Sequence, residues 1–419
     1  MSQQAGKPIP RGFKFVWIPP RWVEYTYYLV FSYSIVAGAL GIEVPLFAAG
    51  LTVALGGLCL IKLGSRRKEI CAPIALLLAC QFSFIFVQAT VYGASVIEDD
   101  LIRTFILWMF AMIIVQSLCL RPGFLQRCTI VIFMLGLSVL PFLGFSDQGV
   151  DRAGISVAVG GSLTNANGLA GWFGFCLVYF GISALETKRG IVRILYGLAA
   201  LGSLLIVGLT VSRGALIGCT LALTVAFRRF LKRAFLPALL LIILGGVLVM
   251  SGLFDSSISN YEERGMEETG RLLVWPLVIE RFLESPIFGV GMSGIMTWIP
   301  DSSHPIPPHN SFLYFALSSG IVPAALYVAF WIRAAWRSFS DVRGSEYSPF
   351  RTPLLLYALG TFILGDINVA PWAVLAVAVG AGSHDSHRRE RLLVTHSKIR
   401  RRRIAPTVQL PSKAKTAQQ

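Results

Sequence analysis

Arg213 is the residue of this chain that most strongly suggests a contact with a ligand. It stands in the run Val-Ser-Arg-Gly-Ala-Leu (211–216), a short turn between two long apolar segments. A charged side chain in such surroundings is costly unless a partner or a ligand meets it, so it indicates a functional site. Gly214 would let a ligand or another stretch of backbone approach closely. The alternative is a structural ion pair with Asp366, which lies at another short turn.

His309 is the second candidate, and it stands in Pro-Pro-His-Asn-Ser-Phe-Leu (307–313), directly before an apolar segment. A neutral imidazole accepts protons near neutral pH and can therefore act as a general base toward an attacking hydroxyl group. Asn310 would orient either the imidazole or a substrate. A lone histidine in a loop more often has a structural role, and that alternative stays open from these residues alone.

The elements that must position these residues are membrane helices. Of the 419 residues, 55% are hydrophobic and 14% charged, which is too apolar for a soluble protein. Segments of about twenty residues with almost no charge recur, each long enough to cross a bilayer, so we expect about twelve transmembrane helices in an all-α polytopic membrane protein. Two segments, 214–227 and 367–382, are short enough to be tilted, bent or partly re-entrant. The expected segments are 25–41, 44–63, 70–92, 102–119, 128–145, 167–185, 191–211, 214–227, 234–253, 311–332, 352–365 and 367–382.

Charge placement orients these segments, because cytoplasmic loops of membrane proteins carry an excess of Lys and Arg. With both termini in the cytoplasm, all but six of the 37 basic residues lie inside, and every lysine is among them. The basic charge therefore predicts a surface that faces membrane lipids and no nucleic-acid partner. We expect a bacterial inner-membrane protein with a cytoplasmic tail 1–24, a membrane domain 25–382 and a basic, disordered cytoplasmic tail 383–419.

One large periplasmic loop, at about 254–310, is expected to contain short amphipathic helices. The segment from Arg271 to Glu284 carries apolar residues at helical spacing, which predicts a helix lying along the membrane surface. Pro276 should bend this helix or start a new one. Glycines and prolines follow it and indicate a tight, irregular region before the chain re-enters the membrane.

The basic residues on the expected outer face are all arginines. The planar guanidinium group suits paired contacts with phosphate or carboxylate and keeps its charge in apolar surroundings. This pattern predicts a site that anchors a diphosphate head group. The alternative is that these arginines pair with carboxylates of the loop, such as Glu262, Glu263 or Glu280. The outer arginines are Arg103, Arg152, Arg213, Arg264, Arg271 and Arg281.

Five short motifs follow one another between residues 165 and 323. They are Asn165-Ala-Asn-Gly-Leu-Ala170, Ser212-Arg213-Gly214, Gly270-Arg271 with Trp275, Ser285-Pro-Ile-Phe-Gly-Val-Gly291, and His309-Asn310 with Gly320. The set resembles the O-antigen ligase and polymerase superfamily, membrane glycosyltransferases that act on undecaprenyl-diphosphate-linked glycans at the outer face of the inner membrane. The chain departs from the pattern at Pro323, where ligases tend to have Gly, Thr or Tyr, and this weakens the ligase assignment relative to the polymerase one.

The resemblance implies a metal-independent, inverting glycosyl transfer that needs no cofactor, and the sequence shows no Asp-x-Asp motif to hold Mg²⁺. By this resemblance, Arg213 and Arg271 hold the diphosphate of the lipid-linked donor, with help from Arg264. His309 acts as the general base or positions the acceptor hydroxyl. Further substrate contacts are expected from Asn310, Asn165 and Asn167.

Two classes of function remain open at this point. The first is a glycosyltransferase whose acceptor is either lipid A-core, as in a ligase, or another glycan repeat unit, as in an O-antigen or exopolysaccharide polymerase. The second is a lipid-linked oligosaccharide flippase or a secondary transporter, which would favour charges within several spans and internal repeats. The transferase hypothesis makes a spatial demand, since Arg213, Arg271 and His309 must meet in one cavity that opens to the periplasmic leaflet.

Overall fold

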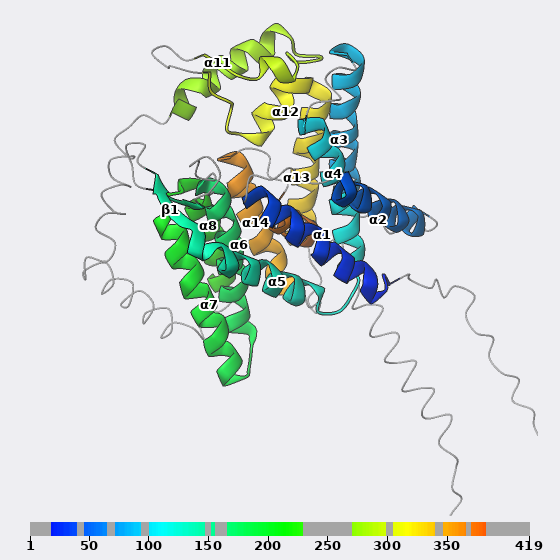
Figure 1. Cartoon of the computed structure of the whole chain (residues 1–419). Coiled ribbons are helices and arrows are strands. Elements are labelled where there is room, and N and C mark those ends of the chain that lie inside the picture. Colours follow the sequence, from blue (N-terminus) through cyan, green and yellow to red (C-terminus); the bar gives the residue numbers. More distant parts are fainter. Residues whose placement is uncertain are drawn as a thin grey trace, which may run out of the picture.

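The computed structural model describes residues 18–39, 46–64, 72–93, 100–146, 152–155, 166–228, 270–298, 305–339, 347–365 and 370–382 (Figure 1). These ranges form thirteen α-helices, two short 3-10 helices and one two-stranded sheet. The first half contains α1 (Arg21–Ala39), α2 (Leu46–Gly64), α3 (Ala72–Val91), α4 (Asp100–Leu118), α5 (Phe124–Val139), η2 (Leu140–Phe142), β1 (Leu143–Ser146), β2 (Arg152–Ile155) and α6 (Ala166–Glu186). The second half contains α7 (Gly190–Leu209), α8 (Arg213–Arg228), α11 (Gly270–Glu284), η3 (Met292–Gly294), α12 (Ser311–Ser319), α13 (Ile321–Phe339), α14 (Ser348–Ile363) and α15 (Pro371–Gly380).

Four of the described helical segments are long and apolar enough to cross a membrane. They are Ala72–Val91, Phe124–Phe142, Ala166–Glu186 and Gly190–Leu209, and shorter apolar helices cover Phe47–Lys62, Phe105–Leu118 and Pro371–Gly380. The protein is thus helical with several apolar segments, as expected of an integral membrane protein. The number of spans and the side on which the termini lie stay predictions, and the expected segment 234–253 and the tail 383–419 lie outside the described residues.

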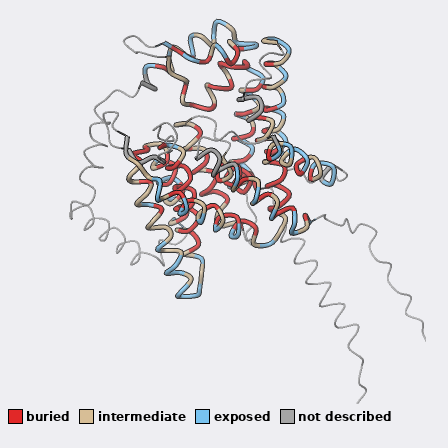
Figure 2. The backbone as a smooth tube through the Cα atoms, viewed as in Figure 1, coloured by how far each residue is buried: buried red, intermediate tan, exposed pale blue. Residues whose placement is uncertain are grey.

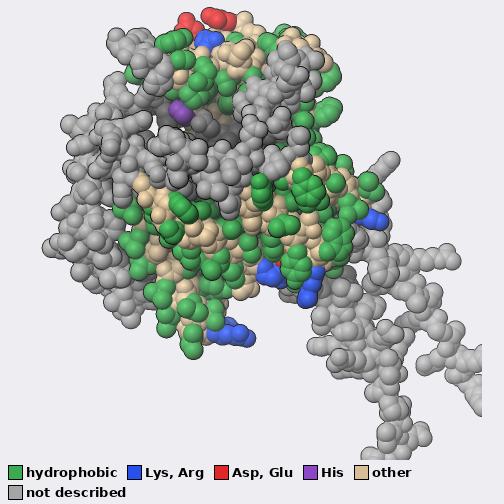
Figure 3. Space-filling view, in the orientation of Figure 1, with side chains coloured by type: hydrophobic (Ala, Val, Ile, Leu, Met, Phe, Trp, Pro, Cys, Tyr) green, Lys and Arg blue, Asp and Glu red, His purple; other side chains and the backbone are tan. Residues whose placement is uncertain are grey.

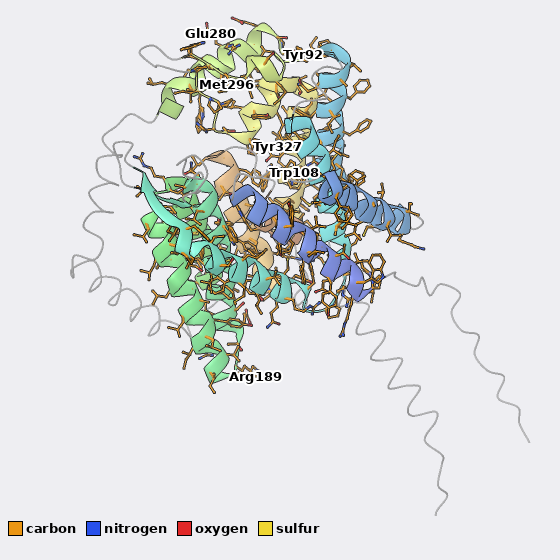
Figure 4. The ribbon with its side chains drawn as sticks, in the orientation of Figure 1. Tyr92, Trp108, Arg189, Glu280, Met296 and Tyr327 are labelled. Atoms are coloured by element: carbon orange, nitrogen blue, oxygen red, sulfur yellow. The ribbon has the colours of Figure 1, made fainter. Side chains whose placement is uncertain are left out.

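The helices pack into one body with α11 and α12 at one end. α6 packs against α7 and α8, α8 against α14, and α3 against α13. Figure 2 shows that buried residues concentrate where these helices meet, whereas α7 leaves large apolar side chains exposed, as a lipid-facing helix would. These are Ile191, Ile194, Leu195 and Leu198. In Figure 4, Arg189 and Glu280 lie at opposite ends of the molecule, in agreement with the separation of charge expected from the sequence.

The expected single span 311–332 is wrong, because Gly320 divides it into α12 and α13. Gly320 has a φ of +82°, a conformation that residues with a side chain rarely adopt. A Cβ atom at this position would also collide with the carbonyl group of Ile287. The chain therefore turns where the backbone of a distant loop comes too close for any side chain.

The expected helix 128–145 is also wrong in its last part. α5 ends at Val139, and Pro141 lies in the 3-10 turn that follows. Residues 143–146 then form β1, which pairs antiparallel with β2, so that Leu143 lies opposite Ile155 and Ser146 opposite Arg152. Proline favours the end of a helix because it lacks a backbone N–H group and clashes with the preceding turn. α11, in contrast, continues through Pro276 without a second helix start.

A buried carboxylate fixes α1 to the turn between α4 and α5. Glu24 is 1% exposed and pairs with Nε of Arg121 at 2.8 Å and Nε of Arg127 at 2.7 Å. The hydroxyl group of Tyr28 donates a third bond to the same carboxylate at 2.7 Å. A charge removed from water needs partners of this kind, because an unpaired buried charge is strongly destabilising.

α8 and α14 cross at two glycines, Gly218 and Gly360. A Cβ atom on Gly360 would lie 2.8 Å from the Cα atom of Gly218, so the two backbones are in direct contact. Small residues permit such close helix packing in membrane proteins. This crossing holds α8, and therefore Arg213 at its start, against α14.

We predict that Gly360→Val lowers stability by about 1–3 kcal/mol, because a side chain here must push α8 away from α14. Thermal unfolding in detergent micelles measures the effect. The matched control is Gly197→Val in α7, where a Cβ atom would meet nothing within 4 Å. Equal midpoint temperatures for the two variants would contradict the proposed role of the crossing.

Candidate functional site

Arg213 is the first residue of α8 and directly follows a tight turn. Val211, within that turn, has a φ of 49°, which is uncommon for a β-branched residue. Ser212 donates a hydrogen bond from its hydroxyl group to Oδ1 of Asn167 at 3.1 Å. The structure thus brings together the N-terminal ends of α6 and α8, and with them two of the residues that the sequence singled out.

The guanidinium group of Arg213 has an unsatisfied nitrogen. Its Nη2 atom is removed from solvent and has no hydrogen-bond partner among the residues that the structure describes. A buried donor without a partner costs free energy, and native proteins contain few of them. The backbone N–H groups of the first helical turn add partial positive charge at the same place. This end of α8 is therefore suited to an anionic group.

Another segment of backbone passes beside Gly214. A Cβ atom here would lie 3.4 Å from the carbonyl oxygen of Leu364, just beyond α14. The alternative partner of Arg213, Asp366, lies outside the described residues, and so do Asn165 and Arg264. The roles expected of these three residues stay predictions.

His309 precedes α12 in an unusual backbone conformation. Its φ is 47°, one of the two positive values found for non-glycine residues in the described part of the chain. Such a conformation often accompanies a functional site, because other contacts must hold it in place. The side chain is partly exposed, and the space-filling view shows histidine colour at the surface of the molecule below the end formed by α11 (Figure 3).

Asn310 caps α12. It is 8% exposed, and its Oδ1 atom accepts hydrogen bonds from the backbone N–H groups of Phe312 at 2.9 Å and Leu313 at 3.2 Å. Asparagine is one of the residues that best satisfy the free N–H groups at a helix start. Asn310 therefore has a structural role that sequence analysis did not assign, and its contact with substrate stays a prediction.

Trp275 connects α11 with the residue before His309. Its indole Nε1 atom donates a hydrogen bond to the carbonyl oxygen of Pro308 at 2.9 Å. Arg271 lies four residues earlier, so its backbone is about one helical turn from Trp275 on the same side of α11. The side chain of Arg271 lies outside the described part, and its contact with a diphosphate stays a prediction.

The glycine-rich motif 285–291 has a clear structural role. Val290 donates its backbone N–H to the carbonyl oxygen of Leu317 at 2.7 Å, and Ile321 donates to that of Pro286 at 2.9 Å. Gly289, with a φ of +75°, lies so close to Leu317 that a Cβ atom would collide with its carbonyl oxygen. The motif therefore fits the corner between α12 and α13 and fixes the end of α11 there.

Sequence analysis missed two residues of this frame, Gln88 in α3 and Tyr92, which directly follows α3. The hydroxyl group of Tyr92 donates to the carbonyl oxygen of Gly289 at 2.7 Å. Figure 4 shows Tyr92 at the end of α3 next to α11. No spacing rule marks a lone glutamine and a tyrosine near the end of an apolar helix, so these roles carried no sequence signal.

The structure thus forms two groups of predicted site residues. Arg213 lies with Asn167 at the start of α8, and His309 lies with Asn310 and Trp275 at the start of α12. α14 contacts both α8 and α12 and so connects the two groups. That they share one cavity stays a prediction. Within the described ranges, no three His, Cys, Asp or Glu side chains gather as they would around a metal ion.

The residues of both groups fall largely inside one region of similarity to known proteins. Residues 197–328 match the family model described as O-antigen ligase. A protein of Rickettsia conorii named "Putative polysaccharide ligase" is 22% identical over 173 residues, which is 36% of this chain and 40% of that protein. The chain therefore spans about two fifths of the length of this relative. The resemblance seen in the motifs is thereby confirmed, and the chain contains an O-antigen ligase domain across residues 197–328.

Proposed function

We propose that the protein is a membrane glycosyltransferase that transfers or polymerises an undecaprenyl-diphosphate-linked glycan at the periplasmic face of the inner membrane. The observation that carries this proposal is the buried Nη2 atom of Arg213, at the start of α8 within the O-antigen ligase domain, which has no hydrogen-bond partner among the residues that the structure describes. A diphosphate would supply the missing acceptor oxygens and interact favourably with the positive end of the helix.

In the proposed reaction, a hydroxyl oxygen of the acceptor attacks the anomeric carbon of the donor glycan from the side opposite the diphosphate. The bond between that carbon and the diphosphate oxygen breaks, so the configuration at the carbon inverts. His309 takes the proton from the attacking hydroxyl group. Arg213 and Arg271 offset the charge that develops on the leaving undecaprenyl diphosphate, a role that metal ions fulfil in many other transferases.

The conformation of the backbone supports a specific role for His309. A general base must be within hydrogen-bond reach of the proton that it removes, so its placement matters as much as its chemistry. The left-handed backbone at His309, the cap formed by Asn310 and the bond from Trp275 to Pro308 together restrict where the imidazole can lie. This is the arrangement expected of a group that must be positioned before a substrate arrives.

Replacement of Arg213 tests the donor site. We expect both Arg213→Lys and Arg213→Ala to reduce transfer by at least about 100-fold, because a lysine cannot reproduce the paired contacts of a guanidinium group. Transfer from a synthetic lipid-linked donor, measured in reconstituted vesicles, provides the readout. Arg228→Ala, at the exposed opposite end of α8, is the matched control and should retain normal activity. Normal transfer by both Arg213 variants would remove this residue from the site.

Replacement of His309 tests the general base. Asparagine tolerates the left-handed backbone better than most residues, so His309→Asn removes the base with little strain. We expect turnover to fall by about 100- to 10,000-fold while the lipid-linked donor still binds. The KM for the lipid-linked donor should stay close to the wild-type value, because His309 acts on the acceptor hydroxyl group. Wild-type turnover by His309→Asn would count against the assignment.

A deletion strain distinguishes the acceptors. Single, unpolymerised repeat units on lipid A-core would indicate a polymerase, and bare core with long lipid-linked chains would indicate a ligase. Normal lipopolysaccharide with loss of exopolysaccharide would indicate an exopolysaccharide polymerase. Accumulation of lipid-linked glycan on the cytoplasmic side alone would instead support a flippase and would contradict the proposed transfer.

A further inference from the structure

Gln88 uses both ends of its side-chain amide to join three segments. The residue is 0% exposed. Its Nε2 atom donates to the carbonyl oxygen of Ser318 and to Oγ of Ser319, both at 2.8 Å. Its Oε1 atom accepts a hydrogen bond from the backbone N–H of Met292 at 3.3 Å. One side chain thus connects α3 with the end of α12 and with η3.

These bonds belong to a closed ring of contacts that contains His309. Gln88 bonds to the C-terminal end of α12, and the N-terminal end of α12 lies next to His309 in the chain. The hydrogen bond from Trp275 to Pro308 then leads to α11, and the motif 285–291 leads from the end of α11 to η3 and back to Gln88. α12 has only nine residues, so a shift at its C-terminal end moves its N-terminal end as well.

A second buried glutamine on the same helix provides a contrast. Gln81 lies seven residues before Gln88 and is also 0% exposed, so both face the protein interior. Its Nε2 and Oε1 atoms have no hydrogen-bond partner in the described part of the chain. Burial of a glutamine in α3 therefore does not by itself produce a network, and the three bonds of Gln88 are specific to its position.

We propose that Gln88 is a positioning residue of the transfer reaction, with Tyr92 as its auxiliary. Gln88 bonds to the end of α12 and to η3, and Tyr92 bonds to the glycine motif. Together these hydrogen bonds set the distance between α11 and α12 and thereby the position of His309. The inference rests on the proposed function, because it assigns to Gln88 an effect on the rate of that reaction. It goes beyond the proposed function because it gives α3 a role in positioning the site, although α3 lies outside the O-antigen ligase domain.

The test compares Gln88→Met with Gln81→Met in the full-length protein. Methionine has nearly the same volume and shape as glutamine but can neither donate nor accept as the amide does. For Gln88→Met we expect kcat per folded molecule to fall about 10- to 100-fold, since small displacements of reacting groups have effects of this size. The KM for the lipid-linked donor should change less than kcat, because one of the two proposed donor contacts, Arg213, lies on α8, outside the contacts that Gln88 makes. Gln81→Met should retain both constants.

Tyr92→Phe is the milder variant should Gln88→Met yield too little folded protein. It removes the bond to the carbonyl oxygen of Gly289 but keeps the ring beside Gly291. We expect a fall in kcat of about 3- to 10-fold with a smaller change in KM, which corresponds to the loss of one hydrogen bond.

The outcomes separate this inference from the function on which it rests. If wild type transfers no glycan, the proposed function fails. If wild type is active and the Arg213 and His309 variants are not, but Gln88→Met and Tyr92→Phe retain the wild-type kcat per folded molecule, the positioning role alone is wrong. A lower yield or melting temperature with unchanged kcat would likewise show that Gln88 supports only the fold.

Discussion

A polar group that is removed from water inside an apolar protein must find its partner within the chain, and the frame of the site follows from this constraint. The helix break at Gly320 frees backbone groups in the protein interior, and the motif 285–291 together with Gln88 binds them. Because these partners are few and directional, they hold the break in one geometry. The guanidinium group of Arg213 is the opposite case, since one of its nitrogens is buried and unpartnered among the described residues. Paired groups form the frame, and the guanidinium nitrogen without a partner among the described residues lies where we propose that an anionic ligand binds.

The two groups of site residues differ in how they are supported. Arg213 begins a helix whose backbone lies directly against α14 at Gly218 and Gly360. His309 instead depends on a short helix that is held at its start by Asn310 and Trp275 and at its end by Gln88. An inverting transfer needs both a fixed anion contact and a base that is placed accurately against an incoming hydroxyl group. In the proposed reaction these two needs would fall to two separate sets of contacts, which α14 connects.

Much of the fold follows from the sequence, because apolar helices are marked by length and composition. The expected bounds 191–211 and 214–227 agree closely with α7 and α8. The expected helix bounds were wrong where a contact between distant residues determines where a helix ends. The break at Gly320 depends on the carbonyl group of Ile287, and no local pattern reports that proximity. Arg213 could be chosen because charge in apolar surroundings is conspicuous in a sequence, whereas the cap formed by Asn310 and the network of Gln88 become visible only in three dimensions.

The crossing of α8 and α14 also bears on how a bulky substrate could enter. Where two backbones touch at Gly218 and Gly360, no layer of side chains separates the helices, so neither can tilt or slide without opening a seam in the interior. α8, with Arg213 at its start, is therefore held firmly against α14. A bulky substrate of the proposed reaction would have to approach without separating these two helices, and the α11 end of the molecule, where Leu273, Ile279 and Leu283 are exposed, offers an apolar surface for its lipid chain.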